Sequence, residues 1–147
     1  MVETPLPAAH APSLRGISVL AVDDDRDARE FIRSTLEQYG AVVVTASSAG
    51  EARDRFRREP TDVVISDLVM PVEDGMELIR QIRELDAKNG RHTPAVSLTA
   101  LARTDDRRRA LAAGYQMHIA KPIDPIELVS TVERLSQEAR GTALADK

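Results

Sequence analysis

The chain has no cysteine and no tryptophan, and aromatic residues make up only 3% of its 147 residues. Without cysteine it can form no disulfide scaffold, thiolate zinc finger, iron–sulfur site or cysteine nucleophile. No apolar stretch is long enough to span a bilayer, and the N-terminus lacks the basic region and apolar run of a signal peptide. These absences predict a cytoplasmic protein.

A strong charge of one sign is also missing. The 24 acidic and 20 basic residues give a net charge of -4, which provides no general attraction to nucleic acid or to an anionic membrane. The arginine clusters at 53–58 and 107–109 are therefore interpreted as exposed helix faces. Lysine is rare, since only Lys88, Lys121 and Lys147 occur, so a lysine within a motif is informative.

The length predicts a single domain. Residues 1–14 are rich in proline and alanine, which predicts a flexible leader. Residues 140–147 have few large apolar side chains, which predicts a disordered tail. We therefore expect the folded domain over residues 15–139, and because no effector domain follows it, we expect no DNA-binding output from this chain.

Five short apolar runs alternate with five helical patterns. Aliphatic runs without polar alternation are typical of strands that are covered on both faces. The runs are Ile17–Val22, Ala41–Thr45, Val63–Ile65, Ala95–Leu98 and Met117–Ala120, and the helical patterns cover residues 28–39, 48–56, 78–85, 104–113 and 124 onward. This alternation predicts an α/β, doubly wound, flavodoxin-like fold whose five parallel strands lie in the order 2-1-3-4-5.

Polar side chains follow four of the five predicted strands. They are Asp23, Asp24 and Asp25 after the first, Asp67 after the third, Thr99 after the fourth and Lys121 after the fifth. Ligands of a doubly wound sheet bind beyond the carboxyl ends of its strands. We therefore expect one site there, with Asp25 serving instead as the cap of the next helix.

These residue types favour phosphoryl transfer. Carboxylates a few ångströms apart repel one another unless a cation joins them, and a partly open site of oxygen ligands suits Mg²⁺. A carboxylate is also a competent nucleophile toward phosphorus, and an ammonium and a hydroxyl can stabilise the phosphoryl oxygens. The residues therefore predict phosphorylation of Asp67, with Thr99 and Lys121 contacting the phosphoryl group.

In order and spacing, these residues resemble the receiver domain of two-component response regulators. The resemblance covers about residues 16–136 and depends on Asp23-Asp24, Asp67-Leu68-Val69-Met70-Pro71 with Asp74-Gly75, Thr99-Ala100 and Lys121-Pro122. The segment from Gly114 to Pro122 and the Pro/Ala-rich leader are also similar to receivers of hybrid sensor histidine kinases. The chain is thus expected to be either such a receiver or a stand-alone regulator of phosphorelay signal transduction.

The resemblance implies a role for each site residue. Asp67 would accept the phosphoryl group from a phosphohistidine of a partner histidine kinase or histidine phosphotransfer protein. Asp24, Asp67 and the backbone carbonyl of Val69 would bind Mg²⁺, and Asp23 would contact the ion through water. Thr99 would be the switch hydroxyl that swings toward the phosphoryl group.

The sequence departs from the family three residues before Lys121, where many members carry a Tyr or Phe ring that changes rotamer with the switch. Here this residue is His118, and Tyr115 lies three residues further back. His118 is interpreted either as a packing residue or as a modulator of the switch. By resemblance the signal passes through the fourth helix, fifth strand and fifth helix, a face that is also a candidate homodimer contact, and the Lys121–Pro122 bond is cis.

Two other classes share the doubly wound fold. A flavin-binding electron carrier needs a Ser/Thr/Gly-rich phosphate loop after the first strand, where this chain has three aspartates. An aspartyl-phosphate hydrolase has a second Asp two residues after its nucleophile, where this chain has Val69. By resemblance, Val69 and Leu101 border the path of the attacking water, and because neither can orient it, we expect slow hydrolysis. The chain is predicted to be a signalling module that supports its own phosphorylation, not an enzyme.

Overall fold

The computed structural model describes residues 12–100 and 104–145. Within them, every predicted strand and helix is present. The strands are β1 (Ser18–Val22), β2 (Val42–Ala46), β3 (Val63–Asp67), β4 (Ala95–Thr99) and β5 (Met117–Ala120). The helices are α1 (Arg26–Gln38), α2 (Ala49–Arg58), α3 (Gly75–Asn89), α4 (Thr104–Ala113) and α5 (Pro125–Ala145). Strands β3 and β4 continue past the apolar runs, so Asp67 and Thr99 are their last residues.

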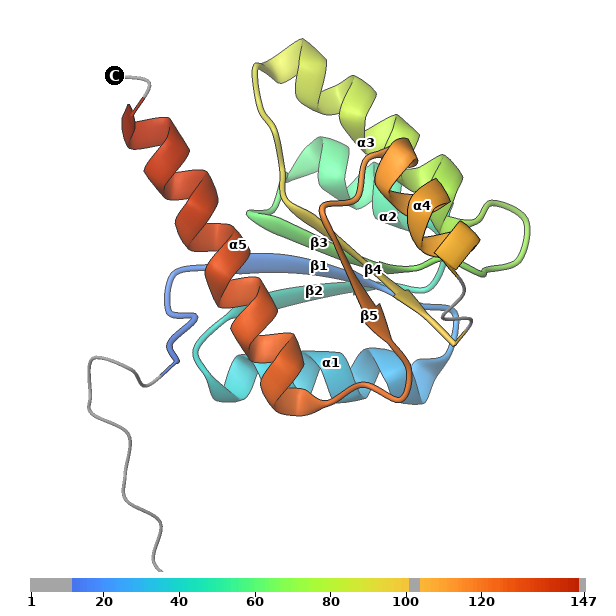
Figure 1. The fold of residues 1–147 in the computed structure, drawn as a ribbon, viewed down its shortest axis with the longest axis horizontal. Helices are drawn as coiled ribbons and strands as arrows, with labels where there is room; N and C mark the ends of the chain where they lie inside the picture. The colour runs from blue at the N-terminus through green and yellow to red at the C-terminus, as the bar shows by residue number, and fades with distance from the viewer. Residues whose placement is uncertain (1–11, 101–103, 146–147) are drawn as a thin grey trace, which may run out of the picture.

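The strands form one parallel sheet in the predicted order β2-β1-β3-β4-β5, with helices on both faces (Figure 1). Buried side chains of α1 and α5 pack on one face, and those of α2, α3 and α4 pack on the other. Neighbouring residues of β1 divide between these two cores, since Val19 and Ala21 face the first while Leu20 and Val22 face the second. Burial of both faces explains why the apolar runs do not alternate with polar residues.

The two ends of the sheet are built from different kinds of loop. Strands point to what we call the carboxyl end, where each strand leads into a helix, and they begin at the amino end. At the carboxyl end, side-chain oxygens cap the helices by accepting backbone N–H groups: Asp25 from Ala28, Ser48 from Glu51, Asp74 from Glu77 and Asp124 from Ile126. These caps satisfy donors that a helix start leaves unpaired.

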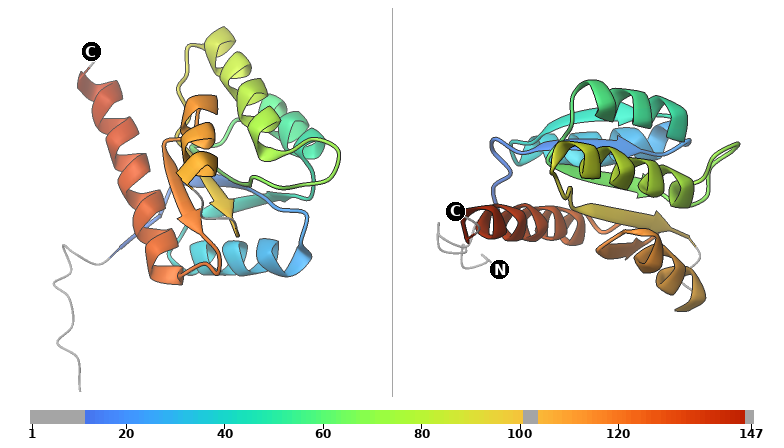
Figure 2. Two further views of the ribbon diagram at one scale, coloured as in Figure 1. Left: turned by 45° about the vertical axis from the view of Figure 1, so that its right-hand side comes forward. Right: turned by 90° about the horizontal axis from the view of Figure 1, so that it is seen from above.

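Helices α2 and α3 lie side by side in one layer, as Figure 2 shows.

The N-terminal part of the fold begins earlier than the sequence predicts. Leu14 is completely buried between α1 and α5, and its N–H donates to the carbonyl of Tyr39 at 2.8 Å. The N–H of Ser13 donates to the Glu133 carboxylate at 3.0 Å. The sequence assigns both residues to the flexible leader, because one leucine after several prolines has no periodicity. Residues 1–11 of that leader lie outside the described residues.

The C-terminal helix is longer than the sequence predicts. It continues to Ala145 and extends beyond the sheet in Figure 1. Residues 140–145 are therefore helical where a disordered tail is predicted. Alanine and leucine in this segment favour helix, and no proline stops it. None of the helices in the described part of the chain is long and apolar enough to cross a membrane.

Candidate functional site

The register of the sheet brings the predicted site residues to one place at its carboxyl end. Strands β1 and β3 are neighbours, and their pairing puts Asp23 beside Asp67. Strand β4 adjoins β3 and ends at Thr99. Lys121 directly follows β5, and its backbone N–H donates to the carbonyl of Thr99 at 2.8 Å. The convergence predicted from the strand ends is therefore confirmed.

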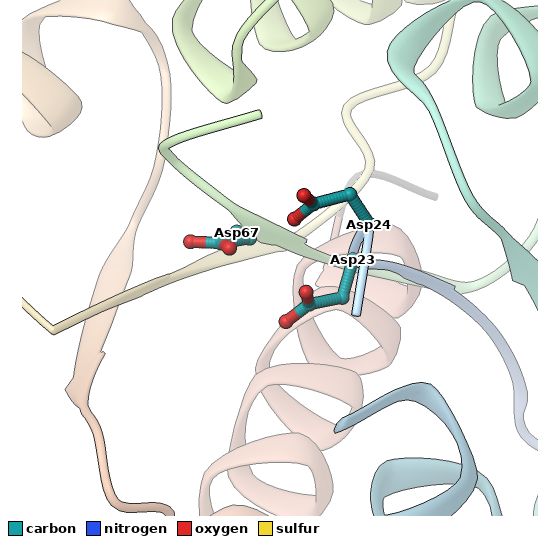
Figure 3. Close-up of side chains that lie close together, drawn as sticks. All are labelled: Asp23, Asp24 and Asp67. Atoms are coloured by element: carbon teal, nitrogen blue, oxygen red, sulfur yellow. The ribbon is translucent and has the colours of Figure 1, made fainter. Parts of the chain in front are cut away.

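Asp23, Asp24 and Asp67 form a carboxylate cluster (Figure 3). One carboxylate oxygen from each residue lies within 4.8 Å of the other two. Asp23 is completely buried and Asp67 is 7% exposed, whereas Asp24 is exposed. A pocket of about 300 Å³ lies beside Asp24, between the start of α2 and the loop after β3. The cluster is thus closed toward the core and open to solvent at Asp24.

The ammonium of Lys121 bridges two of these carboxylates. Its Nζ donates to Asp23 Oδ2 at 2.9 Å and to Asp67 Oδ2 at 3.3 Å. Asp23 Oδ1 also accepts the backbone N–H of Asp25 at 2.9 Å. One ammonium faces three carboxylates, so the cluster keeps a net negative charge.

Titration behaviour reflects this imbalance. Burial raises the pKa of Asp67, and the neighbouring Asp23 raises it further, while Lys121 and the N–H of Val69 oppose the change. For Lys121, burial alone would lower the pKa of the ammonium, but hydrogen bonding and attraction to Asp23 and Asp67 raise it overall. Lys121 therefore stays charged near neutral pH, and Asp67 remains incompletely compensated.

The donor set of the cluster fits Mg²⁺. It offers carboxylate oxygens and no nitrogen or sulfur ligand, which suits a hard cation. Mg²⁺ takes one or two protein carboxylates and keeps several waters, so it needs a site that is open on one side. The exposed Asp24 and the adjacent pocket provide that opening.

The loop between β3 and α3 borders the cluster. The N–H of Val69 donates to Asp67 Oδ1 at 3.3 Å, and the Val69 side chain is 63% exposed. A Cβ on Gly75 would overlap the backbone carbonyl of Asp67, so α3 can begin this close to the site only with glycine. The other predicted border residue of the water path, Leu101, lies outside the described residues.

The remaining predicted residues lie around the cluster. Thr99 is 1% exposed at the end of β4, and the Lys121–Pro122 bond is cis, as the resemblance implies. Asp25 caps α1, as predicted. His118 lies on β5 outside the carboxylate cluster, with its Nδ1 3.2 Å from Ser97 Oγ.

Sequence reasoning missed one residue that touches the site loop. Tyr115 is 2% exposed, and its hydroxyl donates to the carbonyl of Gly75 at 2.7 Å. The available signal was an aromatic residue directly after a helix-ending glycine, in a chain with few aromatics. That signal indicates burial, but it does not identify the partner.

Comparisons with known proteins agree with this architecture. Residues 19–133 match the family model described as the response regulator receiver domain. An uncharacterized 14.6 kDa protein from the sodA1 3′ region of Leptolyngbya boryana is 43% identical over 122 residues, which are 83% of this chain and 92% of that protein. Probable histidine kinase 2 of Oryza sativa subsp. indica is 35% identical over 133 residues, covering 81% of this chain but only 13% of the kinase.

A solved structure shows the same fold. The receiver domain of the Francisella response regulator 1452 superposes with a TM-score of 0.76 at 29% identity, over 84% of this chain and 98% of that domain. Members of this family are signalling modules, which favours that interpretation over the hydrolase and flavin alternatives. The chain therefore belongs to the response regulator receiver domain family.

Proposed function

We propose that this receiver domain accepts a phosphoryl group on Asp67 from a phosphohistidine of a histidine kinase or histidine phosphotransfer protein. A carboxylate oxygen of Asp67 forms the bond to phosphorus, and the phosphorus–nitrogen bond breaks as the imidazole leaves with the bonding electrons. The incompletely compensated negative charge of Asp67, in an acidic cluster that opens to solvent at Asp24, is the observation that carries this proposal. The similarity to a histidine kinase supports the class of partner.

The same proposal assigns Mg²⁺ to Asp24, Asp67 and the backbone carbonyl of Val69, with Asp23 contacting the ion through water. Bound Mg²⁺ supplies positive charge against the oxygens of the carboxylates and of the incoming phosphoryl group. The Asp24 side chain is exposed, so it can turn toward a ligand without disturbing the core. The Asp23 carboxylate is held in place by hydrogen bonds from Lys121 and from a backbone N–H.

Lys121 and Thr99 are assigned to the phosphoryl oxygens. The Lys121 ammonium already lies 3.3 Å from Asp67 Oδ2, and Thr99 ends the neighbouring strand. We expect Lys121→Ala to lose phosphorylation while keeping Mg²⁺ binding, because the ammonium attracts the phosphoryl group but repels the cation. Lys121→Arg should not restore phosphorylation, since a broad planar guanidinium replaces a compact charge poorly.

Intact mass spectrometry tests the acceptor. The purified protein is incubated with Mg²⁺ and phosphoramidate, and we expect one phosphoryl adduct that hydroxylamine removes, as expected for an acyl phosphate. Asp67→Asn should give no adduct. Asp27→Asn is the matched control, because Asp27 is an exposed residue in the first turn of α1.

The outcomes separate the candidate functions. An equal adduct on Asp67→Asn would reject Asp67 as the acceptor. Loss of the adduct within seconds, with release of inorganic phosphate, would favour the hydrolase alternative. A persistent adduct agrees with the exposed, apolar Val69 beside the acceptor, and replacing Val69 by a polar residue should shorten its lifetime.

We expect the output to pass through the face made by α4, β5 and α5. Among residues 107–113 of α4, whose side chains the structure describes, Ala110 is buried, Ala113 is half-buried and the others are exposed. Leu111 on α4 is 51% exposed, and Ile126 at the start of α5 is 71% exposed.

A homodimer through this face would cover apolar surface of this kind. Sedimentation before and after phosphorylation measures the mass of the protein in solution. Leu111→Glu should prevent any increase in mass, and an unchanged mass in the wild type excludes the dimer.

A further inference from the structure

Tyr115 connects two loops that are 40 residues apart in the chain. It lies between α4 and β5, and its buried hydroxyl donates to the carbonyl of Gly75 at 2.7 Å. Its ring belongs to the core cluster that also contains Leu68 and Met70 of the β3–α3 loop. The side chain therefore reaches from the α4–β5 loop to the loop that follows Asp67.

Gly75 in turn lies against the backbone of the phosphoacceptor. Its α-carbon is so close that a Cβ there would overlap the carbonyl oxygen of Asp67. Its N–H donates to the carbonyl of Leu68 at 3.0 Å, and the Ser66 hydroxyl donates to the carbonyl of Asp67 at 2.9 Å. A shift in the backbone after Asp67 must therefore move Gly75, and with it the oxygen that Tyr115 holds.

The other end of this connection is the end of α4. The N–H of Tyr115 donates to the carbonyl of Ala110 at 3.0 Å, so its backbone closes the last turn of the helix. The next residue, Gln116, donates its N–H to the carbonyl of Ala95 and begins the approach to β5. Tyr115 thus contacts the loop after Asp67 through its side chain and the end of α4 through its backbone.

The hydroxyl stays a neutral donor under ordinary conditions. Burial raises the pKa of the Tyr115 hydroxyl far above its usual range. The hydroxyl therefore keeps its proton near neutral pH and can donate a hydrogen bond to the carbonyl of Gly75.

We propose that Tyr115 is a positioning residue that couples the β3–α3 loop to the end of α4 through its hydrogen bond to Gly75. This inference depends on the proposed phosphorylation of Asp67. The proposal gives the coupling role to the buried side chain of Tyr115. The position at which many receivers carry a ring that changes rotamer is occupied here by His118.

Tyr115→Phe tests the proposal, since it keeps the ring and removes the hydroxyl. Mg²⁺ with beryllium fluoride is the probe, because this tetrahedral group mimics a phosphoryl group on a carboxylate. Backbone amide NMR shifts are recorded in the β3–α3 loop and in residues 113–117 of the full chain. In the wild type we expect both groups to shift. In Tyr115→Phe the loop should shift as before, whereas the shifts at 113–117 should fall to less than half.

Tyr39→Phe is the matched control, because Tyr39 lies at the end of α1, at the amino end of the sheet, and should give the wild-type pattern. Equal shifts at 113–117 in the wild type and Tyr115→Phe would overturn the proposal. So would a large loss of Mg²⁺ affinity in Tyr115→Phe, since the hydroxyl would then act on the site itself. If the wild-type loop does not respond to the probe, the proposed function fails instead, and the two failures remain distinct.

Discussion

Asp86 and Asp67 are both buried carboxylates, but they lie at opposite ends of the sheet and have different surroundings. Near the amino end, Asp86 accepts hydrogen bonds from Arg83 at 2.9 Å and from the N–H and hydroxyl of Thr93 at 2.8 and 2.9 Å. At the carboxyl end, Asp67 accepts one backbone N–H and the ammonium of Lys121, both at 3.3 Å. The protein satisfies the first carboxylate and leaves the second with weak contacts.

The backbone shows the same difference. In the described residues, glycine occupies the positions of positive φ in the helix-to-strand loops and before β1: Gly16, Gly40, Gly90 and Gly114. At the carboxyl end the residue with positive φ is Val72, for which this conformation is unfavourable. The amino end is therefore built for stability, whereas the carboxyl end retains unsatisfied charge and strain beside the site. Four substitutions or additions can break or sharpen this comparison.

The largest expected effect is at Asp86. Asp86→Ala removes the acceptor of three short hydrogen bonds and leaves buried donors of Arg83 and Thr93 without it. Breaking a buried pair on one side should lower the free energy of unfolding by about 3 kcal/mol, measured by urea denaturation. The control Asp54→Ala removes an exposed ion pair with Arg57 and should change it by less than about 1 kcal/mol. Similar effects for both variants would contradict the comparison.

Mg²⁺ should stabilise the folded domain only by binding at the carboxyl end of the sheet. At ten times its Kd, a ligand that binds only the folded state adds about 1.4 kcal/mol to the free energy of unfolding, and EDTA should reverse this gain. Asp24→Ala should abolish the gain, because Asp24 is the exposed member of the carboxylate cluster. Asp27→Ala should preserve it. The same gain in Asp24→Ala would remove Asp24 from the metal site.

Asp67→Asn should stabilise the metal-free domain at neutral pH. Burial and Asp23 raise the pKa of Asp67 in the folded state above its unfolded value. The folded state therefore binds the proton more tightly, and stability falls as pH rises from the unfolded toward the folded value. Thermal melts in EDTA across acidic to neutral pH measure this fall, which Asp67→Asn should reduce. A destabilised Asp67→Asn would show that Asp67 is fully compensated.

The sequence sufficed to predict the strand order and the composition of the acidic site. Parallel strands bring their carboxyl ends together whatever their exact length, so Asp23, Asp67, Thr99 and Lys121 converge even though the predicted end of β3 was two residues short. Phosphoryl transfer at this site is predicted from the residue types. The assigned roles of these residues stay predictions until they are tested.

Other features depend on contacts that no periodic pattern records. Leu14 is a single apolar residue after prolines, and its burial depends on the distant α1 and α5. Asp86 looks like a solvated residue of a charged helix, because its partner Thr93 follows only after the chain has turned. The positive φ of Val72, in the loop between Asp67 and Gly75, is one that the propensity of valine argues against.

The smallest expected change in the free energy of unfolding is for a substitution of Val72. Its φ is 69° and its side chain is fully exposed, so nothing is lost from the core when it is shortened. Relief of the left-handed conformation is worth roughly 1–2 kcal/mol, and the greater freedom of glycine in the unfolded chain offsets about 0.5–1 kcal/mol of it. Val72→Gly should therefore raise the free energy of unfolding by about 0.7 kcal/mol, within a range of roughly 0–1.5 kcal/mol. The control Val42→Gly changes an exposed residue of β2, where extended backbone suits valine, and it should destabilise by about 1 kcal/mol. If Val72→Gly and Val42→Gly both destabilise the domain, Val72 stores no strain. Val72→Asn gives a second test, because asparagine tolerates positive φ without the added chain entropy of glycine, and it would then destabilise the domain too.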